Sequence, residues 1–254
     1  MNAAVPDGGG VLKDDPIIEA IFEIGFGSAE VPEVIVGRLS DLPLWREGKK
    51  ARLPAADFPE VIRAREPRLR YNPTLEISGL PSVSRVRVGG RVLALHFLAP
   101  YPGWASVKAV LFSALDGLYS AVTDVTCERL NLRYINALTP ERHYVNSVSE
   151  LQCSLTAEGE QVSDPMHVKY QKNASDLHTV HVQLTSKSFI SGRIPKGTSA
   201  IVDIAVSTPS GFKTAGAGAV RQWMDDAHTF EKRSFRKLLG DALWAKLELK
   251  NDAH

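Results

Sequence analysis

The sequence predicts an α+β protein made of two packed halves, each with a mainly antiparallel sheet covered by helices. Two kinds of pattern support this class. Short runs of alternating apolar and polar residues recur along the chain, as in half-buried strands. A few segments instead repeat apolar residues every three or four positions, as in amphipathic helices. With 44% apolar and 23% charged residues, the composition is that of an ordinary folded chain with a sizeable core.

Three parts are expected in chain order. Residues 1–15 contain Gly8-Gly9-Gly10 and lack apolar periodicity, which predicts a flexible leader. An N-terminal α+β half is expected over 16–140, and a C-terminal α+β half that ends in helices over 141–254. At 254 residues, one large domain and two closely packed halves are both compatible with the length.

The first half reads as strand, helix, hairpin, helix and strand, which is the βαββαβ order of a ferredoxin-like unit. The hairpin is predicted from Gly89-Gly90, which separates two alternating runs. Ser28 is a candidate cap for the first helix, and 45–73 reads as a loop with a small helical turn. The expected elements are a strand at 17–26, a helix at 30–42, strands at 84–88 and 91–98, a helix at 104–122 and a strand at 128–138.

The second half reads as several strands followed by a long helix. Turn residues separate the strand-like runs, and Gly240 is expected to interrupt the terminal helix. The expected elements are strands at 151–157, 166–171, 179–186 and 200–207, and a helix at 219–249. Such a multi-strand sheet with terminal helices completes the α+β prediction.

Glu19 and Glu23 share the outer face of the first predicted strand, opposite its apolar residues. Two interpretations are open. Adjacent carboxylates can raise one another's pKa and act in acid/base chemistry. More commonly, glutamates on a sheet face are solvated or pair with arginines of a neighbouring strand.

The strand at the middle of the chain supplies the other candidate binding residues. Arg133, Tyr134 and Asn136 are expected near a cleft between the two halves, together with Glu19 and Glu23. Because a cation in a central strand needs a partner, we expect Arg133 to pair with those glutamates.

A basic stretch covers residues 46–91, with eleven lysines and arginines against five acidic residues. Its loop and hairpin are suited to following a phosphate backbone, although an acidic protein surface would suit them equally. The nucleic-acid candidates are Arg68, Arg70, Arg85, Arg87 and Arg91.

No catalytic residue, metal site or cofactor is predicted. His178 and His181 are three apart on a strand and should face opposite ways, which disfavours a shared metal. His228 and Glu231 share a helix face, where a contact is more common than an active-site pair. Two isolated cysteines, Cys127 and Cys153, are expected to be reduced thiols.

The net charge is only +1, so any nucleic-acid surface must be local. No apolar run is long enough for a membrane helix, and the N-terminus lacks the pattern of a secretion signal. We therefore expect a cytoplasmic protein without a membrane partner.

Two segments carry a resemblance. Pro16-x-x-Glu19-Ala20-x-x-Glu23-Ile24-x-Phe26 and Leu132-Arg133-Tyr134-Ile135-Asn136 resemble the paired signatures of a sporadically distributed prokaryotic family of uncharacterised proteins of about this length. Ile201-Val202-Asp203-Ile204 resembles the aliphatic strand of that family, and His228 followed by Phe235 resembles its terminal helix. This sequence departs from the pattern at Ala205, where the family has a second acid.

The resemblance implies no catalytic motif. The leading hypothesis is therefore a non-enzymatic binding or scaffold subunit of a multi-protein prokaryotic system, such as a defence or toxin–antitoxin-like cassette. Its partner would be another protein, and a homodimer is compatible with the sequence. The alternative is a nucleic-acid-binding module of duplicated ferredoxin-like type, with ribonuclease activity as one form.

Overall fold

The computed structural model describes residues 12–163, 165–190 and 194–249. It confirms the α+β class, with nearly equal helix and strand content, 33% and 34%, and a large antiparallel sheet. The chain divides into two compact units that interleave in sequence. The α1–α3 unit contains Ala20–Leu132 and Ser207–Asp225, and the β9–β11 unit contains the described residues up to Glu19, Arg133–Val206 and those from Asp226 onward.

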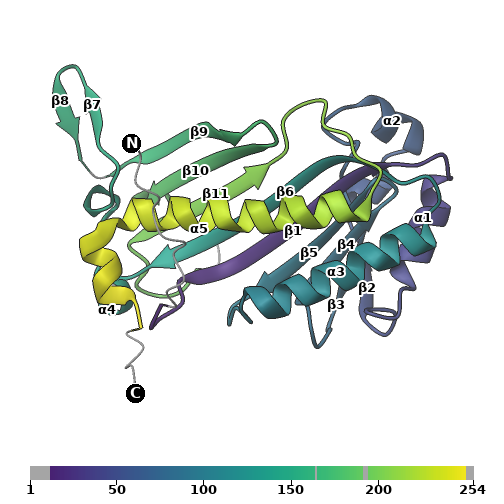
Figure 1. Cartoon of the computed structure of the whole chain (residues 1–254), viewed down its shortest axis with the longest axis horizontal. Helices are drawn as coiled ribbons and strands as arrows, with labels where there is room; N and C mark the ends of the chain where they lie inside the picture. Colours follow the sequence, from purple (N-terminus) through teal and green to yellow (C-terminus); the bar gives the residue numbers. More distant parts are fainter. Residues whose placement is uncertain (1–11, 164, 191–193, 250–254) are drawn as a thin grey trace. The chain divides into compact units, whose positions relative to one another are not determined.

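Figure 1 labels the elements of both units. The strands are β1 (Ile17–Gly27), β2 (Lys49–Arg52), β3 (Leu75–Ser78), β4 (Arg85–Gly89), β5 (Val92–Leu98), β6 (Thr126–Leu138), β7 (Leu155–Ala157), β8 (Glu160–Val162), β9 (His167–Ser175), β10 (His178–Ser186) and β11 (Ala200–Ser207). The α-helices are α1 (Pro32–Ser40), α2 (Glu60–Arg65), α3 (Trp104–Ala121), α4 (Pro140–His143) and α5 (Ala217–Leu247). The described residues also form short 3-10 turns, η1 (Pro54–Asp57), η2 (Val148–Glu150) and η3 (Lys187–Phe189).

In the α1–α3 unit the strand order is β2-β3-β4-β5-β1-β6. The predicted hairpin is confirmed, because β4 and β5 pair antiparallel from Arg85 opposite His96 to Gly89 opposite Val92. Its turn lies one residue later than predicted, at Gly90 and Arg91, because Gly89 is the last paired residue of β4. Gly90 is required for a close approach, since a Cβ there would lie 2.4 Å from the Cβ of Pro32. The hairpin turn therefore packs directly against the first residue of α1.

The alternation predicted for β1 is confirmed. Ala20, Phe22, Ile24 and Phe26 are buried on one face. The α3 stripe is also confirmed, with Val107, Leu111, Ala114, Leu115 and Leu118 buried. Helix α1 contacts both α3 and β4. The apolar periods thus position the core of this unit as the sequence predicts.

Several elements in and around the predicted loops were missed. The segment 45–73 contains β2, whose four residues are charged or small and all exposed, so no alternation reveals it. Strand β3 lies beyond that segment and was also missed. Ser28 does not cap α1, because the N-cap is Val31 and makes no side-chain cap bond.

The β9–β11 unit contains the strand order β6-β11-β10-β9. The predicted strands at 179–186 and 200–207 are confirmed, and 166–171 is the start of the longer β9. The predicted strand 151–157 is wrong over its first part, because only Leu155–Ala157 pairs, with β8. A turn at Gly159 joins this separate two-stranded sheet.

Helix α5 lies over β10 in this unit, where the ring centroids of Phe230 and His178 are 5.0 Å apart. Its predicted break is confirmed at Gly240, which adopts φ 72°. Gln152 fills the space beside that glycine, since a Cβ at Gly240 would lie 2.8 Å from its Nε2. Glycine is therefore required there both by conformation and by contact.

Candidate functional site

Strand β6 places its candidate binding residues on two faces. Tyr134 and Asn136 are almost fully buried, whereas Arg133, which precedes Tyr134, has a half-buried side chain. The Tyr134 hydroxyl lies 3.4 Å from Nδ1 of His228, so this face is directed toward α5. Because successive strand residues alternate, Arg133 is directed away from α5. The sheet therefore does not bring these three side chains to one surface.

Arg133 forms a two-point ion pair with Asp203 of β11. Its Nε donates to Oδ1 at 2.8 Å, and Nη2 donates to Oδ2. The Asp203 side chain is only 9% exposed, while that of Arg133 is 40% exposed. Hydrogen bonding to Asp203 is the main reason that the pKa of Arg133 is raised. The guanidinium is thus permanently charged and held in a fixed orientation.

The two glutamates of β1 interact with different arginines of β6. Glu19 acts electrostatically on Arg133 and helps to raise its pKa. Glu23 instead forms an ion pair with Arg129, which lies four residues before the expected partner Arg133 on β6. The expected Glu23–Arg133 partnership is therefore corrected, with Asp203 as the hydrogen-bonded partner of Arg133.

Asn136 has a structural role within the β9–β11 unit. Its Nδ2 donates to the backbone carbonyl of Val202 at 3.1 Å, and the residue is 2% exposed. An amide at this depth needs such a partner, because an unsatisfied buried polar group costs free energy. Asn136 therefore ties β6 to β11 rather than presenting its amide to solvent.

Helix α5 contributes two titratable groups near this buried face. His228 contacts Tyr134, with ring centroids 5.9 Å apart. Glu231 is buried, and burial raises the pKa of its carboxyl to about 8, with a further contribution from the charge of Asp15. At neutral pH the Glu231 carboxyl is therefore mainly protonated.

A second polar cluster lies in the α1–α3 unit around Glu128. Its carboxylate accepts hydrogen bonds from the Tyr71 hydroxyl at 2.7 Å and from Arg70 Nη2 at 2.9 Å. The Arg129 guanidinium lies 4.7 Å from the centre of the Tyr71 ring. Gly25 lies beneath that ring, because a Cβ there would be 2.8 Å from Tyr71 Cδ1. The cluster fastens the loop before β3 to β1 and β6.

The basic candidates differ in their surroundings. Arg70 is paired with Glu128, and Arg87 is paired with Glu76 across β3 and β4 at 2.8 Å. Arg85 and Arg91 are half-buried, and Arg68 is exposed. Pairing neutralises part of the positive charge that the sequence count suggests for 46–91.

No group of three or more potential metal ligands is found among the described residues. Cys127 is a buried free thiol, and burial raises its pKa to about 12, which keeps it protonated. Cys153 is a half-buried free thiol. Within the described ranges, no helix is both long and apolar enough to cross a membrane.

Comparisons of the chain with family models, curated proteins and solved structures found no match.

Asp203 was missed as the partner of Arg133, although the sequence contained a signal for it. It is the single charged residue in the strand AIVDIAVS, of which Ala200–Ile204 is buried throughout. A carboxylate in such a strand requires a cation or hydrogen-bond donors nearby. Arg133, one of two arginines of β6, meets that requirement.

Proposed function

We propose that this protein is a non-enzymatic protein-binding component that serves as a scaffold subunit in a multi-protein prokaryotic system. The observation that carries the proposal is a group of large apolar side chains exposed on neighbouring segments of the α1–α3 unit. The exposed fractions are 59% for Val31, 44% for Val34, 45% for Phe58, 62% for Val61 and 48% for Ile62. We call these five residues the α1–α2 apolar group.

The members of the α1–α2 apolar group lie on segments that touch. Arg63 of α2 forms an ion pair with Glu33 of α1 at 3.8 Å and another with Glu60 at 2.9 Å. Val34 follows Glu33 in the sequence and Ile62 precedes Arg63, so both lie next to the ion pair that joins α1 to α2. Exposed apolar groups of this kind are characteristic of interaction surfaces, since burying them in a complex is favourable.

Two arginines beside the group are paired within the chain. Arg63 is compensated by two glutamates, and Arg38 is paired with Glu30 at 2.7 Å. A partner would therefore meet apolar side chains without having to neutralise those arginines. This supports association with another protein, and the resemblance stated above supports a defence or toxin–antitoxin-like cassette as its setting.

The fold proposal is finer than the α+β class. We propose that the first half is ferredoxin-like, supported by the strand order β4-β5-β1-β6 with α1 following β1 and α3 joining β5 to β6. Strands β2 and β3 with α2 would then be an insertion between α1 and β4. The apolar group lies partly on that insertion, where a family can vary its partner without altering the core.

The proposal is tested with the products of the genes that flank this one. Each is co-expressed with the wild type and with Val34→Glu combined with Ile62→Glu, and complex formation is measured by size-exclusion chromatography. The double variant should lose the complex while keeping its melting temperature. Leu155→Glu, which changes a side chain on β7 that is 39% exposed, is the control and should leave the complex intact. Equal binding by all three proteins would contradict the assignment of the surface.

Nucleic-acid binding is the second candidate, supported by the edge strand β2. Its residues Lys49, Lys50 and Arg52 are all exposed, and Arg52 pairs with an exposed aspartate. Binding of a short RNA or DNA should weaken steeply with salt, because each neutralised phosphate releases counterions. Replacing Lys49, Lys50 and Arg52 together by Glu should abolish it. Absence of oligonucleotide retention by the wild type at low salt would reject this candidate.

A further inference from the structure

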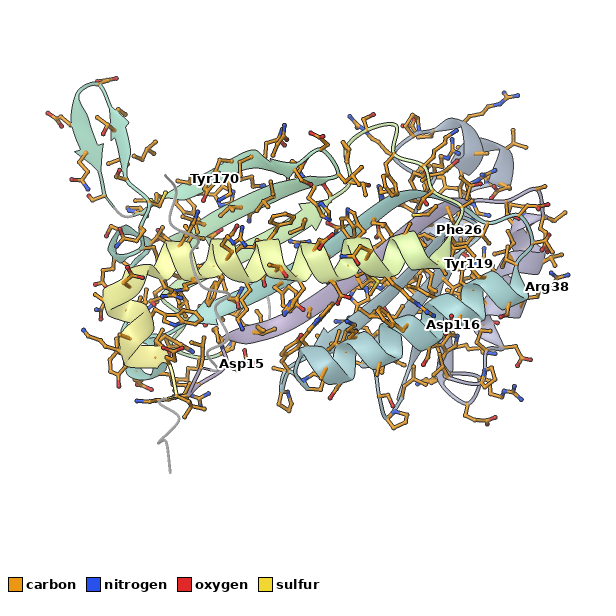
Figure 2. The ribbon with its side chains drawn as sticks, viewed as in Figure 1. Asp15, Phe26, Arg38, Asp116, Tyr119 and Tyr170 are labelled. Atoms are coloured by element: carbon orange, nitrogen blue, oxygen red, sulfur yellow. The ribbon has the colours of Figure 1, made fainter. Side chains whose placement is uncertain are left out.

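Lys172 on β9 faces helix α5. In the antiparallel pairing of β9 with β10, Lys172 is opposite Val180 and Tyr170 is opposite Val182. Directly opposed residues share a sheet face, and both valines are buried. His178, two residues before Val180, contacts Phe230 of α5, which identifies this face as the one that α5 covers. Figure 2 labels Tyr170 on β9.

Two cations of α5 lie on the same helix stripe as Phe230. Arg233 follows Phe230 by three residues, and its guanidinium carbon is 5.9 Å from the centre of that ring. Lys237 follows Arg233 by four residues, so these side chains are neighbours on the helix surface. The stacking on Phe230 limits the orientations of the Arg233 guanidinium.

The charge of Lys237 reaches Lys172. The pKa of Lys172 is lowered, first by burial and then by the positive charge of Lys237. Lys172 lies on the strand face that α5 covers, and Arg233 and Lys237 lie on the helix stripe that contacts this face through Phe230. All three cations are exposed to solvent. We call them the β9–α5 cation group.

Within residues 12–163, 165–190 and 194–249, no ion pair is found for any of the three cations. Two nearby acids of α5, Glu231 and Asp241, do not neutralise these cations. Glu231 is buried with a raised pKa, and Asp241 beyond the Gly240 break pairs with Arg236 at 3.4 Å. Asp226 lies on the same stripe, one turn before Phe230, and has interactions of its own. Like charges held together without a counter-charge favour an anionic ligand.

We propose that the β9–α5 cation group binds the phosphoryl group of a small phosphorylated ligand. A phosphomonoester carries nearly two negative charges and several acceptor oxygens, which suit two ammonium groups and a guanidinium. One strand residue and two helix residues one turn apart form the group. Tyr170, two residues from Lys172 on the same face, offers an aromatic ring for the organic part of the ligand. This proposal is independent of the protein-binding surface on α1 and α2.

The experiment measures binding of four probes by isothermal titration calorimetry at fixed ionic strength. The probes are inorganic phosphate, glucose 6-phosphate, adenosine 5′-monophosphate and a ten-nucleotide DNA strand. Variants Lys172→Gln, Arg233→Gln and Lys237→Gln should each weaken the small-ligand affinity by about tenfold or more. Lys169→Gln is the matched control, because Lys169 is on the same strand but opposite Gln183, on the other face. It should change the affinity by less than about twofold.

A second readout separates a binding role from a structural one. Because the cations repel one another, Lys172→Gln and Lys237→Gln should raise the melting temperature of the ligand-free protein while reducing the rise caused by phosphate. The two organic probes tell whether a sugar or a nucleotide source is preferred. Failure of the wild type to bind any phosphorylated small molecule would overturn the proposal. So would binding of the DNA strand alone, or an equal loss in Lys169→Gln.

Discussion

Arg133 of β6 and Asp203 of β11 form an ion pair with unequal burial, because the arginine side chain is 40% exposed and the aspartate side chain only 9%. The two residues depend on each other to different degrees. An arginine that loses its partner can turn its charge toward water, whereas the aspartate carboxylate would remain buried.

We therefore expect Arg133→Ala to be more harmful than Asp203→Ala. Arg133→Ala should lower the free energy of unfolding by about 2 kcal/mol. This loss is smaller than for a fully buried ion pair because the arginine is partly solvated. The double variant should lose much less than the sum of the single losses. Urea denaturation of the four proteins measures this coupling.

Arg133→Lys should recover only part of the stability, since an ammonium cannot form the two-point pair. The Arg236–Asp241 pair provides the control, because the aspartate side chain is 96% exposed. Asp241→Ala should cost about 0–1 kcal/mol. Additive losses for Arg133 and Asp203 would show that their contact does not stabilise the folded protein.

Glu231 should make the protein less stable as pH rises. Its pKa is about 8 in the folded protein against an ordinary value of 4.5, so between these values the folded chain binds more protons than the unfolded chain. Its stabilising contribution is complete below pH 4.5 and declines up to about pH 8. Over that window the decline should amount to a few kcal/mol, on the order expected for a buried carboxyl.

Glu231→Gln keeps the shape and removes the titration. The variant should match the wild type near pH 5 and exceed its melting temperature at pH 8 to 9, measured by scanning calorimetry across about five pH values. Glu141→Gln, at an exposed position in α4, should reproduce the wild-type profile. A pH profile unchanged by Glu231→Gln would mean that other groups set the alkaline loss.

The sequence predicts the regular core elements because periodicity reflects burial. In β1 the alternate positions Ala20 to Phe26 are buried, and in α3 the apolar stripe faces inward. Gly90 marks a close contact with Pro32, and Gly240 marks a backbone conformation that favours glycine. Where an element is determined by the spacing of its own buried residues, the local sequence pattern is sufficient to predict it.

The candidate site was predicted less well, because side-chain partners depend on the register of strands far apart in sequence. Glu23 and Arg133 have opposite charges and could pair. In the structure, however, Glu23 pairs with Arg129 and Arg133 pairs with Asp203. The β9–α5 cations likewise come together only through the β9–β10 register and the path of α5. Strand β2 was missed because every residue is exposed and none alternates.

The two thiols should react at very different rates. Burial raises the pKa of Cys127 to about 12, so at pH 8 almost none of it is the reactive thiolate. Cys153 is only half-buried. Iodoacetamide should therefore label Cys153 first in the native protein and both residues in urea, as read by peptide mass spectrometry. Rapid native labelling of Cys127 would show that β6 opens readily.

Gly25 should be required by the ring of Tyr71. A methyl group at Gly25 would lie 2.8 Å from Tyr71 Cδ1 and 3.3 Å from the Cβ of Arg129, closer than carbon atoms normally approach. Gly25→Ala should therefore cost about 1–3 kcal/mol of unfolding free energy, through displacement of the ring and loss of its hydrogen bond to Glu128.

The same substitution should be nearly neutral when Tyr71 is already Ala, because the space is then open and alanine restricts the unfolded chain. Gly37→Ala in α1 is the control, since nothing lies within 4 Å of the added methyl group. It should raise stability by about 0.5–1 kcal/mol, as expected for alanine in place of glycine within a helix. Urea denaturation of the four Gly25 and Tyr71 combinations isolates the contact. If Gly25→Ala is equally costly in both backgrounds, strain in β1 rather than the Tyr71 ring accounts for the loss.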